Sequence, residues 1–220
     1  MTIDQAYQLV NFVSNKKQRG NIIPADFNLI APIAQKEVIS NLLGNEQLLS
    51  PSGVPPYGYK ANRKIDTLLR PLIVSPVTIT VTNGLWDYPE GFIWPDAVHK
   101  ADFSLVEIID SDQYPSRKKS VIKPPTSDYP IIILRYPQGF CDPVNLGSFE
   151  MSYVKMPTDP YWAYTEVSDE AVYTASGSVD FALHELAHMR ICLKILQAVG
   201  INLDSAEITQ YAFAKEQQGT

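Results

Sequence analysis

The chain has 220 residues, 45% of them hydrophobic, which is enough to bury one sizeable core in a single domain or in two small ones. Its 24 acidic and 18 basic residues give a net charge of -6 at pH 7, which excludes a strong overall attraction to nucleic acid or to an anionic membrane surface. No apolar run approaches the ~20 residues of a membrane-spanning helix, and the first residues lack the pattern of a secretory signal peptide, so no membrane association is expected.

Two helices are predicted at the N-terminus. The first begins in "TIDQ", where Thr2 and Gln5 have the spacing of a capping box, and it carries an apolar stripe of Ala6, Leu9, Val10 and Val13. The second opens at Pro24 and ends at Gly44, and Pro32 is expected to kink it or split it in two. Its predicted buried side consists of Phe27, Ile30, Ile33, Ala34, Val38 and Leu42.

The middle of the chain is rich in proline and short strand patterns. Residues 45–60, with "SPSGVPPYG", are predicted to form an extended arm, and a short helix is predicted in "NRKIDTLLRPLI", ending near Pro71. The pair Asn83-Gly84 predicts a tight turn, and the run Ile131–Leu134 predicts a deeply buried strand. Strands are predicted over 77–81, 104–109, 129–136, 149–156 and 161–165.

Two further proline-rich stretches, 86–100 and 114–130, are predicted to be loops. We expect these loops, like the arm 45–60, to contact other subunits, because long loops in compact domains usually bind something. The second loop holds the basic cluster Arg117–Lys119, which is expected to be solvated. The aromatic residues that motivate the contact prediction are Trp86, Tyr88, Trp94, Tyr114 and Tyr129.

The last third returns to helical patterns, with helices predicted over 179–199 and 204–217. The core stripe of the first is predicted to be Ala182, Leu186, Met189, Leu193 and Leu196. The predicted fold class is α+β: helical N- and C-terminal segments packed together, with a Pro-rich, antiparallel β middle region. As domain parts we predict a helical part of 1–44 plus 178–220, the arm 45–60 and a mainly β part of 61–177, all within one composite domain.

The most specific motif is His184-Glu185-Leu186-Ala187-His188, an H-E-x-x-H. On a helix, residues four apart share a face, so His184 and His188 could bind one zinc ion while Glu185 polarises water. Glu207 lies at about the distance in sequence of the third ligand in glutamate-liganded zinc peptidases. A zinc-dependent metallopeptidase is therefore the alternative hypothesis.

Two observations favour a structural helix instead. Both histidines fall on the flank of the predicted core stripe, beside Cys192, Ile195 and Val199. The only other histidine, His99, is predicted to lie in a loop, so the sequence offers no orienting groups for a catalytic zinc. We therefore predict no catalytic, cofactor-binding or metal-binding residues and no cofactor. Cys141 and Cys192 are expected to be buried apolar residues of a protein that folds in a reducing cytosol.

The sequence resembles, over about 200 residues, a family of virion proteins from crAss-like tailed phages, which infect Bacteroidota. No single piece is specific, and the ordered series carries the resemblance. The series runs from "DQAYQLVNFVSNKKQRGNIIPADFNLIAPIAQKEVISNLLGNEQ" through "KIDTLLRPLIV", "LWDYPEGF", "VEIIDSDQYPSRKKSVIKPPTSDYPI", "ILRYP" and "YVKMPTDPYWAY" to "ILQAVGINLDSAEITQYAFAKEQQG".

The resemblance implies a structural, non-enzymatic protein of the virion, made in the host cytoplasm. Proteins of this type form rings in the portal–tail region, the head-to-tail connector or neck. The expected partners are further copies of the same chain and the neighbouring ring, portal and tail proteins. DNA is expected to pass through the channel without specific recognition.

Overall fold

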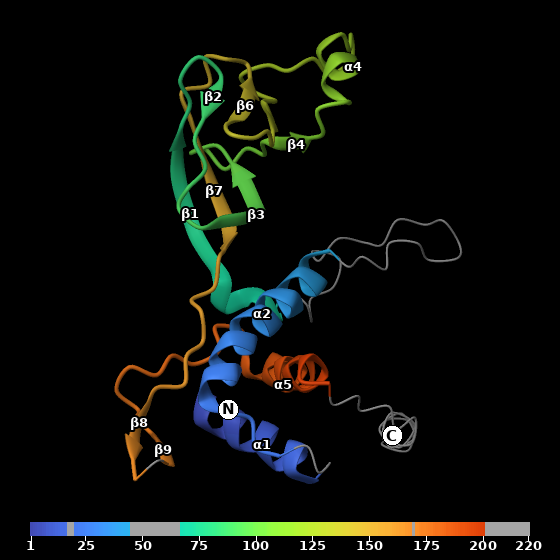
Figure 1. Ribbon diagram of the computed structural model, residues 1–220. Coiled ribbons are helices and arrows are strands. Elements are labelled where there is room, and N and C mark those ends of the chain that lie inside the picture. The colour runs from blue at the N-terminus through green and yellow to red at the C-terminus, as the bar shows by residue number, and fades with distance from the viewer. Residues whose placement is uncertain (17–19, 45–66, 169, 201–220) are drawn as a thin grey trace, which may run out of the picture. The chain divides into compact units, whose positions relative to one another are not determined.

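The computed structural model describes residues 1–16, 20–44, 67–168 and 170–200. The fold is α+β, with helices towards both ends of the described chain and strands in the middle, as predicted (Figure 1). The chain forms two compact units: the sheet unit, Leu72–Met156, and the helical unit, which combines Met1–Pro71 with Pro157–Thr220. The predicted β part, 61–177, thus includes 157–177, which belongs to the helical unit.

The two N-terminal helices begin where the sequence predicts. Helix α1 spans Ile3–Lys16, and its capping box is confirmed: the Thr2 N–H donates to Gln5 Oε1 (3.0 Å), and the Gln5 N–H donates to Thr2 Oγ1 (3.2 Å). Helix α2 spans Pro24–Leu43 and continues without a break through Pro32, so the predicted split is wrong. The predicted segments 45–60 and 204–217 lie outside the described residues.

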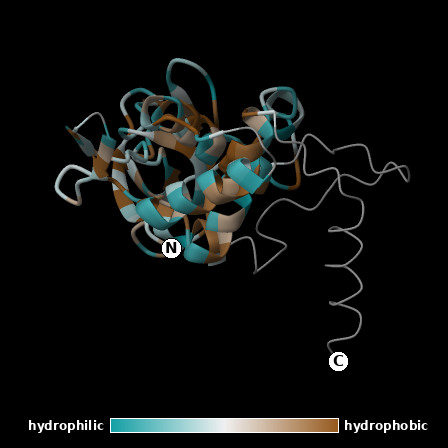
Figure 2. Cartoon of the chain, turned by 60° about the horizontal axis from the view of Figure 1, so that its bottom comes forward, coloured by the Kyte–Doolittle hydropathy of each residue, from teal (hydrophilic) through white to brown (hydrophobic). Residues whose placement is uncertain are grey.

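The buried side of α2 is only partly the predicted one. Ile33 is exposed, while Gln35 is fully buried. Because α2 is apolar around most of its circumference, hydrophobic spacing could not identify which side packs. Hydrophilic and hydrophobic residues are mixed along the helices of the chain, as the teal and brown stretches of the ribbon show (Figure 2). The buried residues of α2 are Phe27, Ala31, Ala34, Gln35, Val38, Ile39 and Leu42.

The predicted helix 179–199 is wrong in its first half. Residues 179–184 are not helical, the 3-10 turn η3 spans Glu185–Ala187, and helix α5 spans His188–Ala198 and packs on α1 and α2. The predicted core stripe is mostly wrong, since Leu186, Met189 and Leu193 are exposed, although Leu196 is buried as predicted. The buried face of α5 instead includes three residues of the predicted flank, His188, Cys192 and Ile195, and the buried His188 ring has carbonyl oxygens beside both of its nitrogens. The whole buried face consists of His188, Ile191, Cys192, Ile195 and Leu196.

Polar side chains of α1 and α2 hold the returning segment 157–182. The Asn28 side chain pairs with the backbone of Trp162, accepting from its N–H (2.8 Å) and donating to its carbonyl (3.0 Å). Gln35 donates to the Thr158 carbonyl (2.9 Å) and accepts from the Ala182 N–H (2.8 Å). These side-chain amides, buried at Gln35 and half-buried at Asn28, satisfy backbone groups that have no ladder partner at those positions.

Two shorter features complete the described helical unit. The predicted short helix appears as a helical turn at 67–69, followed by the 3-10 helix η2, Arg70–Leu72. The hairpin of β8 (Tyr164–Val167) and β9 (Glu170–Tyr173) replaces the strand predicted at 161–165, and β9 was not predicted. In the described part of the chain, no helix is both long and apolar enough to cross a membrane.

The sheet unit contains two sheets. The first has the order β1-β7-β3, with β1 (Ile73–Thr80) and β3 (Phe92–His99) both antiparallel to β7 (Ser148–Lys155). The second has the order β2-β6-β5-β4. Its strands are β2 (Leu85–Trp86), β6 (Gly139–Asp142), β5 (Ile131–Ile133) and β4 (Glu107–Ile109).

One pair of strands departs from the predicted antiparallel pattern. Strands β4 and β5 run parallel, and the crossover between them contains the short helix α4, Tyr114–Lys118. Parallel neighbours need such a connection because a tight turn reverses the chain. The predicted loop 114–130 is thus partly helical, and the predicted loop 86–100 contains β3, whose Pro95 lies on an edge strand where proline is tolerated.

The core of the sheet unit lies between the two sheets. Trp86, Ile132 and Cys141 of the second sheet pack in one cluster with Phe149 and Met151 of β7. On the opposite face of the second sheet, Ile109, Ile131 and Ile133 pack against Tyr114 and Phe140. Strand β5 is therefore buried on both faces, as its continuous apolar sequence predicted.

The predicted Asn83-Gly84 turn is confirmed. Thr82 and Leu85 exchange two backbone hydrogen bonds, of 2.8 and 3.0 Å, and Asn83 and Gly84 have φ of 52° and 78°. Positive φ at both central positions is the signature of a type I′ turn, which asparagine and glycine favour. This turn leads into β2 and places Trp86 in the core.

Candidate assembly surface

The H-E-x-x-H residues do not share one helical face. His184 precedes η3 and caps it, its Nδ1 accepting from the Leu186 N–H (3.3 Å), whereas His188 is the first residue of α5. Glu185 is exposed and lies 4.0 Å from the N-terminal ammonium of Met1. His184 and His188 are therefore not four residues apart on one helix, as the zinc hypothesis requires, and this part of the hypothesis is wrong.

His188 is held as a structural residue. It is buried, its Nδ1 lies 3.0 Å from the Met1 carbonyl oxygen, and its Nε2 lies 2.9 Å from the Leu183 carbonyl oxygen. Its ring also meets the Phe181 ring edge-on, with centroids 5.4 Å apart. Because both ring nitrogens face carbonyl oxygens, neither points a lone pair towards open space. Glu207 lies outside the described residues, and among those described no group of three or more potential metal ligands occurs.

The predicted contact aromatics separate into core and surface residues. Trp86 is fully buried, so it cannot contact another subunit as predicted, and Trp162 is buried in the helical unit. Trp94 and Tyr129 are exposed, and Tyr88 is half-buried, donating its hydroxyl to the Arg135 carbonyl (3.0 Å). Burial raises the pKa of Tyr88 above its usual value.

The remaining predicted residues have ordinary surroundings. Both cysteines are buried, as expected. His99, predicted in a loop, ends strand β3 instead, with Nδ1 3.6 Å from the Glu150 carboxylate and its ring stacked on Phe103.

The four sheet edges of the sheet unit are not equivalent. In the first sheet, β1 contains Pro76 and β3 contains Pro95, and both strands show register shifts against β7. Prolines and bulges prevent an edge from pairing with another strand. In the second sheet, β2 has only two residues, whereas β4 contains no proline and its ladder with β5 has no register shift. Among the described residues, β4 thus has no ladder partner on its outer side from Glu107 to Ile109, whereas the residues just before it are paired with β3: Leu105 bridges His99, and the Val106 N–H donates to the Val98 carbonyl (3.3 Å).

Exposed apolar residues surround this edge. We call Leu105, Ile108 and Tyr129, together with the groove of about 490 Å³ beside them, the β4 surface. The groove is lined by the apolar side chains of Leu105, Val106, Tyr129 and Pro130 and by the polar side chains of Ser104, Glu107, Lys123 and Asp128. Leu105 is 81% exposed, an unusual environment for a leucine next to a strand. Apolar side chains of the adjoining segments are also exposed: Phe103, Val121 and Ile122.

Ion pairs fix the crossover that borders the β4 surface. Glu107 of β4 pairs with Arg117 of α4 and with Lys123, whose Nζ lies 3.2 Å from the carboxylate. Asp142 of β6 accepts from the Tyr114 hydroxyl (2.7 Å) and lies 3.1 Å from Lys118 Nζ. Hydrogen bonds to Tyr114 and then to Asp142 raise the pKa of Lys118.

The basic cluster predicted to be only solvated thus has a structural role, because Arg117 and Lys118 tie α4 to strands on either side of it. Their spacing along the sequence could not reveal this role, since Asp142 lies 24 residues beyond Lys118. The β4 surface is consequently held in place before any partner arrives, which lowers the entropy cost of binding one.

No model of a known protein family matches this sequence, and no curated protein matches it either.

Proposed function

We propose that this chain is a non-enzymatic structural protein of the virion, a ring-forming subunit of the portal–tail assembly of a crAss-like tailed phage. The observation that carries the self-association is the β4 surface: an open strand edge next to a preformed, partly apolar groove. The ordered series of segments that resembles crAss-like virion proteins supports the assignment to the neck region.

In this proposal each copy covers the β4 surface of its neighbour. A closed ring requires head-to-tail contacts, in which different surfaces of two copies meet at each junction. Addition of a strand to β4 would satisfy the backbone groups that its outer edge leaves unpaired in the sheet, while the groove takes apolar side chains of the neighbour.

The same proposal accounts for the charge. A subunit around a DNA channel must let the duplex pass, and phosphate contacts from a strongly basic lumen would retain it. The net charge of -6 suits passage without specific recognition. The remaining partners are the neighbouring ring, portal and tail proteins, and the proposal includes no cofactor and no catalytic residue.

Density from intact virions is the direct test. We expect this chain as a closed ring on the portal–tail axis, with the β4 surface covered by protein. A map in which the chain is absent from that axis, or in which the β4 surface faces solvent, would overturn the proposal.

A variant experiment separates the β4 surface from general surface effects. Particles are assembled in cells that supply either Leu105→Asp or the control Leu85→Asp, in the exposed position of the two-residue edge strand β2. Mass spectrometry of purified particles then measures incorporation. We expect at least a tenfold loss of incorporation for Leu105→Asp and near wild-type incorporation for Leu85→Asp. Equal incorporation of the two variants would contradict the role of β4.

A further inference from the structure

Helix α2 has a second apolar side that the described residues leave uncovered. Its first side packs in the core of the helical unit with residues such as Phe27 and Ala34. On the other side, Leu29 and Ile33, one helical turn apart, are exposed, Leu29 to 68%. A helix that is apolar on two sides normally has both covered.

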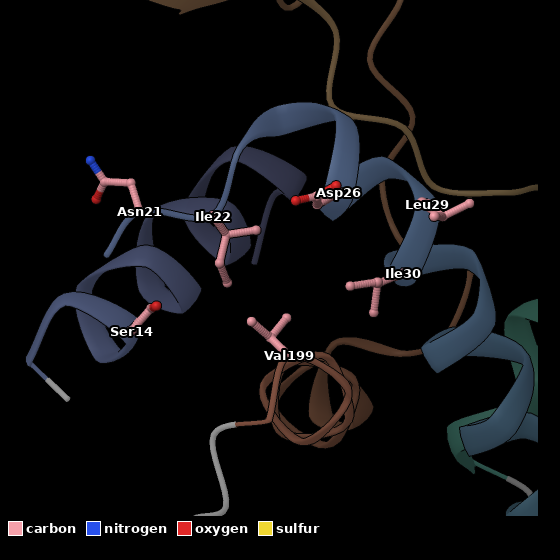
Figure 3. A pocket seen from close by; sticks show the side chains of 7 residues that line it. All are labelled: Ser14, Asn21, Ile22, Asp26, Leu29, Ile30 and Val199. Atoms are coloured by element: carbon pink, nitrogen blue, oxygen red, sulfur yellow. The ribbon is translucent and has the colours of Figure 1, made fainter. Parts of the chain in front are cut away.

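A groove of about 300 Å³ borders this second side. Its apolar lining comes from Ile22, Leu29, Ile30 and Val199, and in Figure 3 the Val199 side chain, at the end of α5, points towards Ile22 and Ile30. Polar lining comes from Ser14, Asn21 and Asp26. The groove therefore has an apolar floor and a partly polar rim, the arrangement that receives one face of an amphipathic helix.

The wall formed by the loop before α2 is fixed by hydrogen bonds. The Ser14 hydroxyl donates to the Gly20 carbonyl (2.7 Å), and the Ile22 N–H donates to Asn11 Oδ1 (2.7 Å). The Tyr7 hydroxyl donates to the Ile22 carbonyl (2.8 Å). The groove is thus preformed and does not need to reorganise when it is filled.

The chain leaves the described region at this groove. Val199 lines it, and Gly200 follows with φ of +78°, a conformation that ends a helix and turns the chain. Residues 201–220 lie outside the described residues, but their sequence predicts a helix over 204–217. Asp204 and Glu207 have capping-box spacing, and Ile208, Tyr211 and Ala212 follow the i, i+3, i+4 pattern of one apolar face.

We propose that the segment 204–217 folds back on its own chain and lays the face of Ile208, Tyr211 and Ala212 on Leu29 and Ile30. A helix of 14 residues is about 21 Å long and is marginal in water without a surface to cover its apolar face. Because only a few residues join the segment to Val199, its effective concentration at the groove is on the order of millimolar. A segment from a second copy would lose translational freedom as well, so the intramolecular occupant is favoured.

Disulfide trapping in the full chain tests this proposal. Leu29→Cys is combined in turn with Ile208→Cys, Tyr211→Cys and Ala212→Cys, and mild oxidation is followed by mass spectrometry. The control series replaces Leu29→Cys by Phe12→Cys, because Phe12 is 65% exposed but does not line the groove. We expect at least one Leu29 pair to cross-link within the chain ten or more times faster than its Phe12 counterpart.

The other outcomes overturn the proposal. Cross-links formed only between chains would assign the groove to a second copy, and equal rates in the two series would mean that the segment does not occupy it. Since purified protein alone is used, failure here leaves the virion proposal untouched, and the reverse also holds.

A double-mutant cycle in the full chain tests independently whether Leu29 and Tyr211 are in contact. Leu29→Asp and Tyr211→Asp should each lower the Tm by about 3 °C, and the double variant should lower it by about 3 °C rather than 6 °C, because both remove the same contact. Additive shifts would show that the two residues do not meet.

Discussion

Different kinds of contact stabilise the inside of the helical unit and the inside of the sheet unit. In the helical unit, segments distant in sequence are joined by polar side chains, the buried Gln35 and the half-buried Asn28, that bond to the backbone of 157–182. In the sheet unit, distant segments are joined by backbone hydrogen-bond ladders and by an apolar core between the two sheets. The helical unit therefore depends on buried hydrogen bonds in addition to its apolar core, whereas the sheet unit depends on the fit of side-chain volumes between its two sheets.

The largest expected loss of stability comes from adding side-chain volume to the core of the sheet unit. A Cβ added at Gly139 would lie 2.1 Å from a carbon of the Trp86 ring, which is itself buried. Gly139→Ala should therefore destabilise the protein by about 4 kcal/mol, at the upper end of overpacking effects, measured by chemical denaturation. The control is Gly44→Ala in the helical unit, where the backbone is extended and nothing lies within 4 Å of the new Cβ. If Gly139→Ala destabilised the protein no more than Gly44→Ala, the sheet unit would not depend on side-chain volume in its core.

The next effect tests the hydrogen bonds of the helical unit. Gln35→Leu keeps a side chain of similar size but leaves the Thr158 carbonyl and the Ala182 N–H without their partner, at a cost of about 2–3 kcal/mol. Gln138→Ala is the control, because Gln138 makes one exposed hydrogen bond to Asp87. If both glutamine variants had the same denaturation midpoint as the wild type, the polar contacts would not hold the helical unit.

A smaller effect is expected at the two histidines. His188→Ala removes the ring that joins the Met1 and Leu183 carbonyls and should cost about 2 kcal/mol, whereas His184→Ala removes one exposed cap and should cost under about 1 kcal/mol. Elemental analysis of undialysed protein should find no stoichiometric zinc. About one zinc per chain, lost in both variants, would instead make the histidines ligands.

The smallest expected effect is on the labelling rate of the two native thiols, one in each unit. Burial raises the pKa of Cys141 to about 12, aided by the nearby Asp142 carboxylate, and burial raises the pKa of Cys192 to about 11. At pH 8, below both values, the thiols stay protonated and should react slowly with a thiol reagent until their unit opens.

The two labelling rates sharpen the comparison. Gly139→Ala should speed labelling of Cys141, in the sheet unit, more than that of Cys192, and Gln35→Leu should do the opposite. Equal acceleration of both thiols in both variants would show that the units open together.

Features set by neighbouring residues could be read from the sequence. The capping box of Thr2 and Gln5, the start of α2 at Pro24 and the Asn83-Gly84 turn each depend on a few adjacent positions, and all three are confirmed. The burial of β5 was also predictable, because an uninterrupted apolar run needs cover on both faces.

Strand β3 shows why other elements were missed. Its sequence contains Pro95, which argues against a strand, yet β3 is an edge where proline does not cost a ladder bond on the paired side. Whether a strand lies at an edge depends on the whole sheet. The open edge of β4 has the same origin, because only the strand order leaves it without a neighbour on one side.

The sequence by itself determined the α+β class, the helix starts and the tight turn, because local hydrogen bonding and hydrophobic spacing decide them. Only the tertiary structure decided which side of α2 and α5 is buried, since both helices offer two plausible faces and the partners are far away in sequence. It also decided the role of His188. An imidazole on an amphipathic helix can coordinate metal or join two loops, and the carbonyl oxygens of Met1 and Leu183, brought beside its two nitrogens by the fold, make it a structural link.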